Sequence, residues 1–185
     1  TTQYIRMDGK RQFLTSGGLG TMGYGLPAAI GASIGNPGNP VICISGDGGA
    51  QMNIQELATA HALETPVILC IFNNTYLGNV KQMQKMFYNK RYSSTCLRYS
   101  RSCNRQCRID GTCTGGDYVP DFVKLAESYG CTGIRVENEA QMDEAFKRAA
   151  ENTKSVTLIE FMLDCEYDVY PMVPGGAALS DMMFG

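Results

Sequence analysis

The segment from residue 41 to residue 76 has the pattern that most constrains the fold of this chain. It contains two short apolar runs, residues 41–45 and 67–72, on either side of one amphipathic stretch. The first run ends in Gly-Asp-Gly-Gly and the second in Asn-Asn. Two strands joined through one helix lie parallel, with a right-handed crossover. We therefore expect Asp47 and Asn74 to lie at the same, carboxyl-terminal edge of a sheet.

The rest of the chain continues the alternation of strands and helices. Hydrophobic spacing and helix start and stop signals predict helices over residues 26–34, 53–63, 80–88, 120–129 and 139–151, and further strands over 132–136 and 156–161. This order is typical of an α/β domain with at least four parallel strands and helices on both faces of the sheet. A chain of 185 residues has room for one such domain with a proper core.

Composition gives no reason to expect a nucleic-acid or membrane partner. The net charge is −2, and no uninterrupted apolar stretch approaches the length of a membrane span, about 18 residues. No signal peptide opens the chain, so a cytoplasmic location is expected. A solvated loop and helix face would explain the one gathering of basic residues: Lys81, Lys85, Lys90, Arg91, Arg98, Arg101, Arg105 and Arg108.

The polar residues at the strand ends have the chemistry of a metal and phosphate site. Mg²⁺ prefers oxygen ligands, which the Asp47 carboxylate, the Asn74 amide and the Tyr76 backbone carbonyl could supply. Gly48 and Gly49 would let backbone N–H groups approach a diphosphate closely. Each motif alone could be a tight turn, because Gly and Asn are common turn residues. Together they favour a site for Mg²⁺ and a diphosphate.

Gly-Asp-Gly followed by Asn-Asn, with 24 residues between Gly48 and Asn73, resembles the thiamine diphosphate-binding motif. The strings GDGGAQMNIQELATA, SGGLGTMGYGLPAAIGAS, FVKLAESYG and YPMVPGGA are similar to the large catalytic subunit of acetolactate synthase (acetohydroxyacid synthase). The resemblance covers nearly the whole chain except a Cys-rich insertion at residues 93–117. It implies that residues 1–185 are the C-terminal diphosphate-binding domain of a larger enzyme, with a parallel sheet of about five to six strands.

The resemblance also implies an activity. Acetolactate synthases are transferases that use thiamine diphosphate and Mg²⁺ to join two pyruvates, or pyruvate and 2-oxobutyrate, with loss of CO₂, in the first common step of branched-chain amino acid biosynthesis. The full-length enzyme also contains FAD. Its partners would be the N-terminal and middle domains, a second subunit in a homodimer or tetramer, and a small regulatory subunit. No catalytic residue is expected here, because the activating glutamate belongs to the N-terminal domain; the isolated chain should be inactive.

Family positions that bind the cofactor fall in three segments of this sequence. By resemblance they are Gly20, Thr21 and Met22 for the aminopyrimidine ring, Gly46, Asp47, Gly48, Gly49 and Ala50 for the diphosphate, and Asn74, Tyr76, Leu77 and Gly78 beside the metal. Met83 matches a position that is commonly Trp and shapes the preference for the second substrate. With Met86 and Phe87 it also forms an apolar stripe at helical spacing, typical of core or of a docking face.

Four of the eight cysteines lie within 18 residues of the insertion: Cys96, Cys103, Cys107 and Cys113. Four thiolates could bind Zn²⁺ or an iron–sulfur cluster, but the usual Cys-x-x-Cys pair is absent, and free thiols in a loop are the simpler interpretation. The other four, Cys43, Cys70, Cys131 and Cys165, fall in or beside apolar strands and are expected to be buried.

Two further functions remain open from the sequence. The first is another thiamine diphosphate-dependent 2-oxo acid decarboxylase or carboligase, such as a pyruvate oxidase or a glyoxylate carboligase, since the shared motif does not separate these enzymes. The second is a standalone cofactor- or metal-binding module that uses the cysteines. The single histidine, His61, lies within a predicted helix without a nucleophile motif nearby, so we expect a structural role.

Overall fold

The computed structural model describes residues 4–9, 12–98 and 120–185. The chain forms two compact units. The first comprises Thr1–Asn73 and Pro120–Met162, and the second comprises Asn74–Val119 and Leu163–Gly185. No helix in the described part of the chain is long and apolar enough to cross a bilayer.

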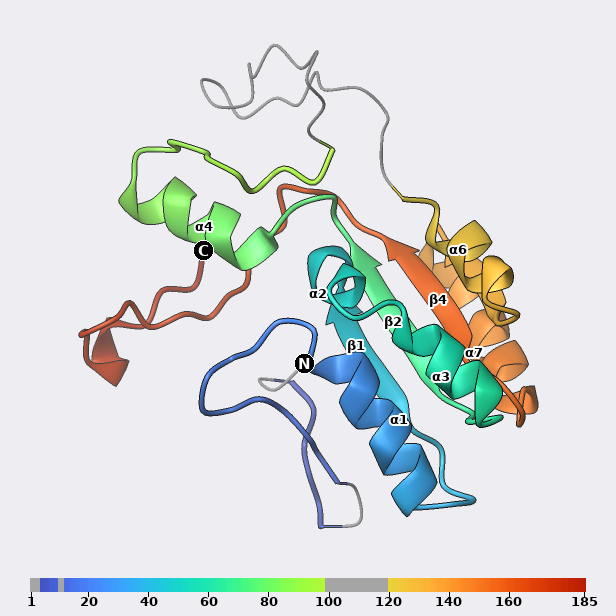
Figure 1. The fold of residues 1–185 in the computed structure, drawn as a ribbon. Helices are drawn as coiled ribbons and strands as arrows, with labels where there is room; N and C mark the ends of the chain where they lie inside the picture. Colours follow the sequence, from blue (N-terminus) through green and yellow to red (C-terminus); the bar gives the residue numbers. More distant parts are fainter. Residues whose placement is uncertain (1–3, 10–11, 99–119) are drawn as a thin grey trace. The chain divides into compact units, whose positions relative to one another are not determined.

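A parallel sheet of four strands forms the centre of the first unit (Figure 1). The strands are β1 (Ile42–Gly46), β2 (Ile68–Asn73), β3 (Thr132–Val136) and β4 (Thr157–Met162), in the order β1-β2-β4-β3. The predicted parallel α/β class is confirmed. The count of five to six strands is wrong for the described residues, because the four β-rich runs of the sequence supply one strand each and no other described segment joins the sheet.

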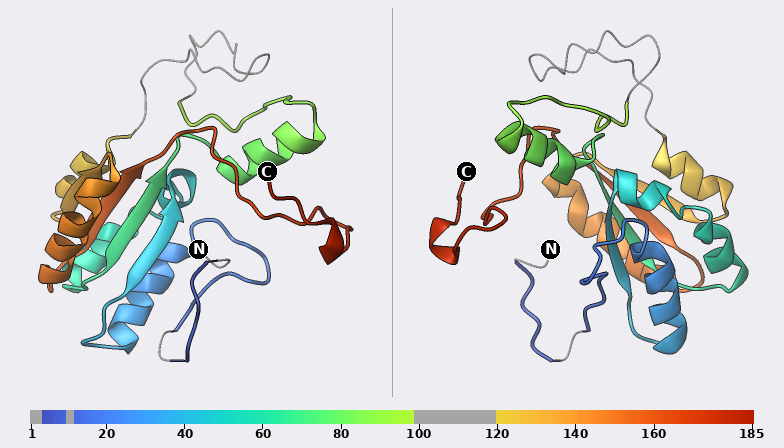
Figure 2. Two further views of the ribbon diagram at one scale, coloured as in Figure 1. Left: turned by 180° about the vertical axis from the view of Figure 1, so that it is seen from behind. Right: turned by 60° about the vertical axis from the view of Figure 1, so that its left-hand side comes forward.

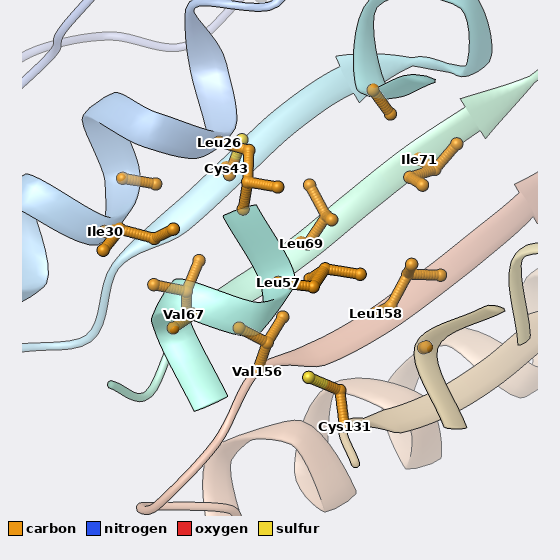
Figure 3. Packing of buried hydrophobic residues seen from close by; sticks show 14 of the residues in the cluster. Leu26, Ile30, Cys43, Leu57, Val67, Leu69, Ile71, Cys131, Val156 and Leu158 are labelled. Atoms are coloured by element: carbon orange, nitrogen blue, oxygen red, sulfur yellow. The ribbon is translucent and has the colours of Figure 1, made fainter. Parts of the chain in front are cut away.

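Helices cover both faces of this sheet, as predicted. Helices α1 (Gly25–Gly35), α3 (Glu56–Ala62) and α6 (Phe122–Ser128) lie on one face. Their apolar side chains pack with strand residues of that face in the main core (Figure 3). Leu57, Leu69 and Leu158 are fully buried there. The core holds the strand ends in place, because close-packed interiors resist displacement.

Helix α7 (Met142–Glu151) covers the opposite face and packs against β3 and β4. The left view of Figure 2 shows the molecule from this side. Ala145 and Ala149 let this helix approach Ile159 and Phe161 closely. A second cluster of buried apolar residues forms at this contact. The predicted helix of residues 139–151 begins with a turn of 3-10 helix, Glu139–Gln141, before α7.

The helices that follow β1 and precede β3 also differ from the sequence prediction. The Gly-Asp-Gly-Gly segment after β1, where a glycine turn is expected, contains a short helix, α2 (Asp47–Gln51). The helix predicted over residues 53–63 begins only at Glu56, after a series of turns. Asp121 precedes α6 instead of lying in its first turn, and its side chain caps the helix by accepting the Lys124 N–H at 3.2 Å.

The second unit contains helix α4 (Gly78–Phe87), and the described residues do not bury its apolar stripe of Met83, Met86 and Phe87, which leaves the docking-face interpretation of that stripe. The buried residues are Lys81 and Gln82, whereas Met83 is partly buried and Phe87 is half exposed. Polar contacts with the C-terminal segment explain why Lys81 and Gln82 are buried. The Lys81 ammonium lies 2.6 Å from a Glu166 carboxylate oxygen, so Lys81 is not part of a solvated basic face.

The C-terminal segment also pairs with itself and with α4. Met172 and Met183 form an antiparallel bridge within this segment. Gln82 bonds both backbone groups of Val169, with its amide nitrogen 2.9 Å from the carbonyl and its amide oxygen 3.0 Å from the N–H. These contacts give residues 163–185 a defined conformation within the second unit.

Three of the four cysteines expected in the core are buried, namely Cys43, Cys70 and Cys131. Cys165 is only partly buried, so that prediction is wrong for this residue. It follows β4 by three positions, beyond the apolar run. Of the four cysteines in the insertion, Cys96 is partly buried and bridges Tyr76 through the backbone, and Cys103, Cys107 and Cys113 lie outside the described residues.

We expect Cys43 and Cys70 to resist alkylation in the folded protein. Burial raises the pKa of the Cys43 thiol to about 11 and that of Cys70 to about 12. The reactive thiolate of Cys43 at pH 8 is therefore about 100-fold scarcer than for an ordinary thiol. The neutral thiols favour the folded state up to about pH 9, and this contribution is lost as the pH rises toward 11.

Mass spectrometry after a timed iodoacetamide pulse at pH 8 measures this difference. Cys165 is the internal control: burial also raises the pKa of its thiol, but its side chain is partly exposed and open to the reagent. Labelling of Cys43 and Cys70 at the rate of Cys165, in protein shown to be folded, would be incompatible with their burial.

Candidate functional site

The corner between β1 and α2 positions Asp47. Gly46 ends β1 opposite Phe72 of β2, so the two strands finish at one edge of the sheet, as the βαβ pattern predicts. Asp47 is the first residue of α2 and is only 2% exposed. One of its carboxylate oxygens accepts the Gly48 N–H at 3.0 Å, which fixes the direction of the side chain. The carboxylate is thus buried and oriented at this edge.

The residues after Asp47 are small because the backbone turns tightly there. A Cβ at Gly49 would lie 3.0 Å from the Ser45 hydroxyl, closer than ordinary packing allows. Gly48 and Ala50 are buried in the same turn of helix. A larger residue at Gly49 would crowd the Ser45 side chain, beside the backbone that carries the predicted diphosphate-binding N–H groups.

A second loop, residues 20–23, is tied to the same region of the first unit. The Gly20 and Thr21 N–H groups donate to Ser16, and the Asn53 amide donates to the Gly23 carbonyl at 2.9 Å. Gly23 has φ +89°, and a Cβ there would lie 2.8 Å from the Asn53 amide nitrogen. Sequence reasoning missed Asn53; the only signal was an amide following the Gly-Asp-Gly segment.

Met22 lies in this loop, and 42% of its surface is exposed. Its side chain is therefore not part of the buried core of the first unit. An exposed apolar side chain beside the loop backbone is compatible with the expected contact to an aminopyrimidine ring.

The predicted metal-binding turn opens the second unit. The Asn74 side-chain oxygen accepts the Tyr76 N–H at 3.0 Å, which orients the amide. Between them, Thr75 has φ +62°, a conformation that is rare for a β-branched residue and concentrates at functional sites. The Thr75 carbonyl accepts the Leu97 N–H, and the Leu77 N–H donates to Thr95. Backbone pairing therefore holds the turn in this strained form.

Gly78, the first residue of α4, lies against the same amide. A Cβ at this position would meet the Asn74 side-chain nitrogen at 2.8 Å. Leu77 precedes it at the N-cap of α4. The glycine is needed for the close approach of helix and amide, so Gly78 contributes to the orientation of Asn74.

The predicted metal ligands are divided between the two units. Asp47 belongs to the first, and Asn74 and Tyr76 belong to the second. Their donor set of carboxylate, side-chain amide and backbone carbonyl is the all-oxygen set that Mg²⁺ takes, and an amide oxygen has a second lone pair beyond its hydrogen bond. The residues present therefore fit Mg²⁺. Across the described residues, no three His, Cys, Asp or Glu side chains group as a metal site.

Residues 1–161 match the family described as thiamine pyrophosphate enzyme, C-terminal TPP binding domain. The chain belongs to this family. This membership confirms the resemblance of the Gly-Asp-Gly and Asn-Asn motifs to the thiamine diphosphate-binding motif.

Several curated relatives of the chain are named acetolactate synthases. The chain is 43% identical to a probable acetolactate synthase large subunit of Methanococcus aeolicus over 97% of its length. It is 40% identical to the large subunit of Corynebacterium glutamicum and 39% identical to the isozyme 3 large subunit of Escherichia coli, over 98% and 97% of its length. The chain spans about a quarter of these relatives, 26%, 27% and 28%.

A solved structure supports the same fold. The thiamine diphosphate-dependent 4-hydroxybenzoylformate decarboxylase of Rhodococcus jostii matches 77% of this chain with a TM-score of 0.63 and 30% sequence identity. The match covers 23% of that protein. The parallel sheet of this chain thus has the fold of one part of a known thiamine diphosphate enzyme.

Proposed function

We propose that this chain is the C-terminal thiamine diphosphate-binding domain of an acetolactate synthase large subunit. The observation that carries the proposal is the 39–43% identity to three such subunits along nearly the whole chain. The full-length subunit would convert two pyruvates to 2-acetolactate, or pyruvate and 2-oxobutyrate to the homologous product, with release of CO₂. This is the first common step of branched-chain amino acid biosynthesis.

In this proposal the chain anchors the cofactor. Asp47, Asn74 and the Tyr76 carbonyl would hold Mg²⁺, and the backbone of residues 48–50 would bind the diphosphate. The loop of residues 20–22 would meet the aminopyrimidine ring. Thiamine diphosphate, when bound, supplies the carbanion-stabilising chemistry of 2-oxo acid decarboxylation. The contribution of these residues is binding and orientation, and no side chain of this chain is assigned a proton transfer.

The remaining parts of the enzyme would come from outside this chain. The activating glutamate and the FAD site belong to the N-terminal and middle domains of the proposed subunit, and the active enzyme would be a homodimer or tetramer, with a small regulatory subunit. Met83, partly buried on α4, would shape the choice of second substrate, because it offers less flat area for stacking than Trp.

A second candidate is a simple 2-oxo acid decarboxylase on the same fold, which the Rhodococcus jostii neighbour favours. Product analysis separates the two. The full-length protein, supplied with Mg²⁺, thiamine diphosphate and FAD, should form 2-acetolactate from pyruvate and a mixed product when 2-oxobutyrate is added. Release of CO₂ with free acetaldehyde as the main product would instead identify a decarboxylase. The isolated 185-residue chain should form neither.

A further inference from the structure

A carboxylate is buried in the middle of the sheet. Glu160 lies on β4 and is 1% exposed. Along this strand it shares a face with Val156 and Leu158, which belong to the main apolar core. Burying a carboxylate destabilises the fold unless the carboxylate is paired and hydrogen-bonded. The contacts of Glu160 therefore indicate its role.

Each Glu160 carboxylate oxygen has one partner. One accepts from the Asn73 side-chain amide at 2.7 Å, and the other accepts from the Arg135 guanidinium at 2.8 Å. Arg135 also donates to Asp121 at 2.9 Å, ahead of α6. The hydrogen bond to Glu160 raises the pKa of Arg135, whose guanidinium is in any case charged at working pH. These hydrogen bonds connect Asn73 at the end of β2, through Glu160 on β4, to Arg135 on β3.

Asn73 is the last residue of β2 and is itself 1% exposed. The next residue is Asn74, the proposed Mg²⁺ ligand, and the strained Thr75 follows it. The direction in which the backbone leaves β2 therefore depends on how Asn73 is held. The Asn73 side chain is held by a short, charge-assisted hydrogen bond, which is stronger than a bond between neutral groups.

We propose that Glu160 is a positioning residue for the cofactor site: it fixes the Asn73 amide and so the start of the Asn74–Tyr76 turn. This inference rests on the proposed function. It gives a reason for a carboxylate at a place where an apolar residue would suit the core. An alternative is that Glu160 and Arg135 form only a structural ion pair, with the Asn73 bond incidental.

Two double variants of the full-length protein separate these explanations. Glu160→Leu with Arg135→Leu removes both charges and the acceptor for Asn73, in an apolar replacement that folded proteins often tolerate. Glu160→Gln with Arg135→Gln removes the same two charges but keeps an amide oxygen for Asn73. The two variants differ in that acceptor, so the second is the matched control.

The readouts are the dissociation constant of thiamine diphosphate in the presence of Mg²⁺ and the unfolding midpoint without cofactor. We expect the Leu/Leu variant to bind about 10- to 100-fold more weakly than wild type, the range seen when residues behind a metal ligand are lost. The Gln/Gln variant should bind within about threefold of wild type, with both midpoints similar. Equal affinity of the two double variants would overturn the positioning role.

Asn73→Ala provides a second route if the Leu/Leu variant does not fold. It leaves the Glu160–Arg135 ion pair in place and removes the amide that donates to Glu160. We expect the same loss of affinity, and wild-type affinity in folded Asn73→Ala protein would also overturn the inference. Failure of the wild-type protein itself to bind thiamine diphosphate with Mg²⁺ would overturn the proposed function instead, and the positioning role with it.

Discussion

Asp47→Asn in the full-length protein is expected to weaken Mg²⁺-dependent binding of thiamine diphosphate by about 100-fold or more, since even residues behind a metal ligand contribute 10- to 100-fold. Asn keeps the shape of the side chain and an oxygen that can accept the Gly48 N–H, so the corner between β1 and α2 should remain folded. It lacks the negative charge that a hard divalent cation prefers. Acetolactate formation at a fixed, limiting cofactor concentration should fall accordingly.

Asp143→Asn is the matched control, because it makes the same charge change at an exposed position on α7. Isothermal titration of thiamine diphosphate in Mg²⁺ buffer gives the dissociation constants of both variants. A wild-type constant for Asp47→Asn would show that Asp47 is not a metal ligand.

Gly78→Ala is expected to weaken cofactor binding while leaving stability nearly unchanged. The added Cβ would meet the Asn74 amide nitrogen at 2.8 Å, and this is the mobile end of a side chain, which can move aside at small cost to the fold. Moving aside turns the Asn74 oxygen away from the position in which it accepts the Tyr76 N–H. Because misplacement of a binding group by about 1 Å can cost 100-fold, we expect a 10- to 100-fold loss of affinity for thiamine diphosphate with Mg²⁺.

Gly31→Ala is the control for this substitution, since a Cβ at that exposed position in α1 meets nothing within 4 Å. Thermal unfolding and thiamine diphosphate titration are measured for both proteins. Loss of stability in parallel with loss of affinity for Gly78→Ala would indicate a general packing defect and contradict a specific effect on Asn74.

The sequence was sufficient for the local architecture. The apolar runs ending at Ser45 and Phe72 predicted two parallel strands that finish at one edge, and the structure pairs Gly46 with Phe72 there. Periodicity and glycine signals are local, so the strands, the helices and the family could be recognised without knowledge of long-range contacts.

Features that depend on distant residues could not be predicted in this way. Lys81 was expected at the surface, but Glu166, 85 positions away, makes its burial possible. Glu160 lies in an apolar run whose pattern says nothing of Asn73, 87 positions away. Buried polar residues are set by their partners, and a periodic pattern identifies only the apolar faces.

The central claim is that Asp47, after β1, and Asn74, after β2, bind a diphosphate through Mg²⁺. The most direct test is to measure binding of thiamine diphosphate to the full-length protein, with Mg²⁺ or with EDTA. Thiamine, which lacks the diphosphate, is the matched ligand. We predict tight binding of thiamine diphosphate with Mg²⁺, binding at least about 100-fold weaker in EDTA, and weak binding of thiamine under both conditions. Equal affinity for thiamine and thiamine diphosphate, or an affinity that EDTA does not change, would contradict Mg²⁺-dependent binding of the diphosphate.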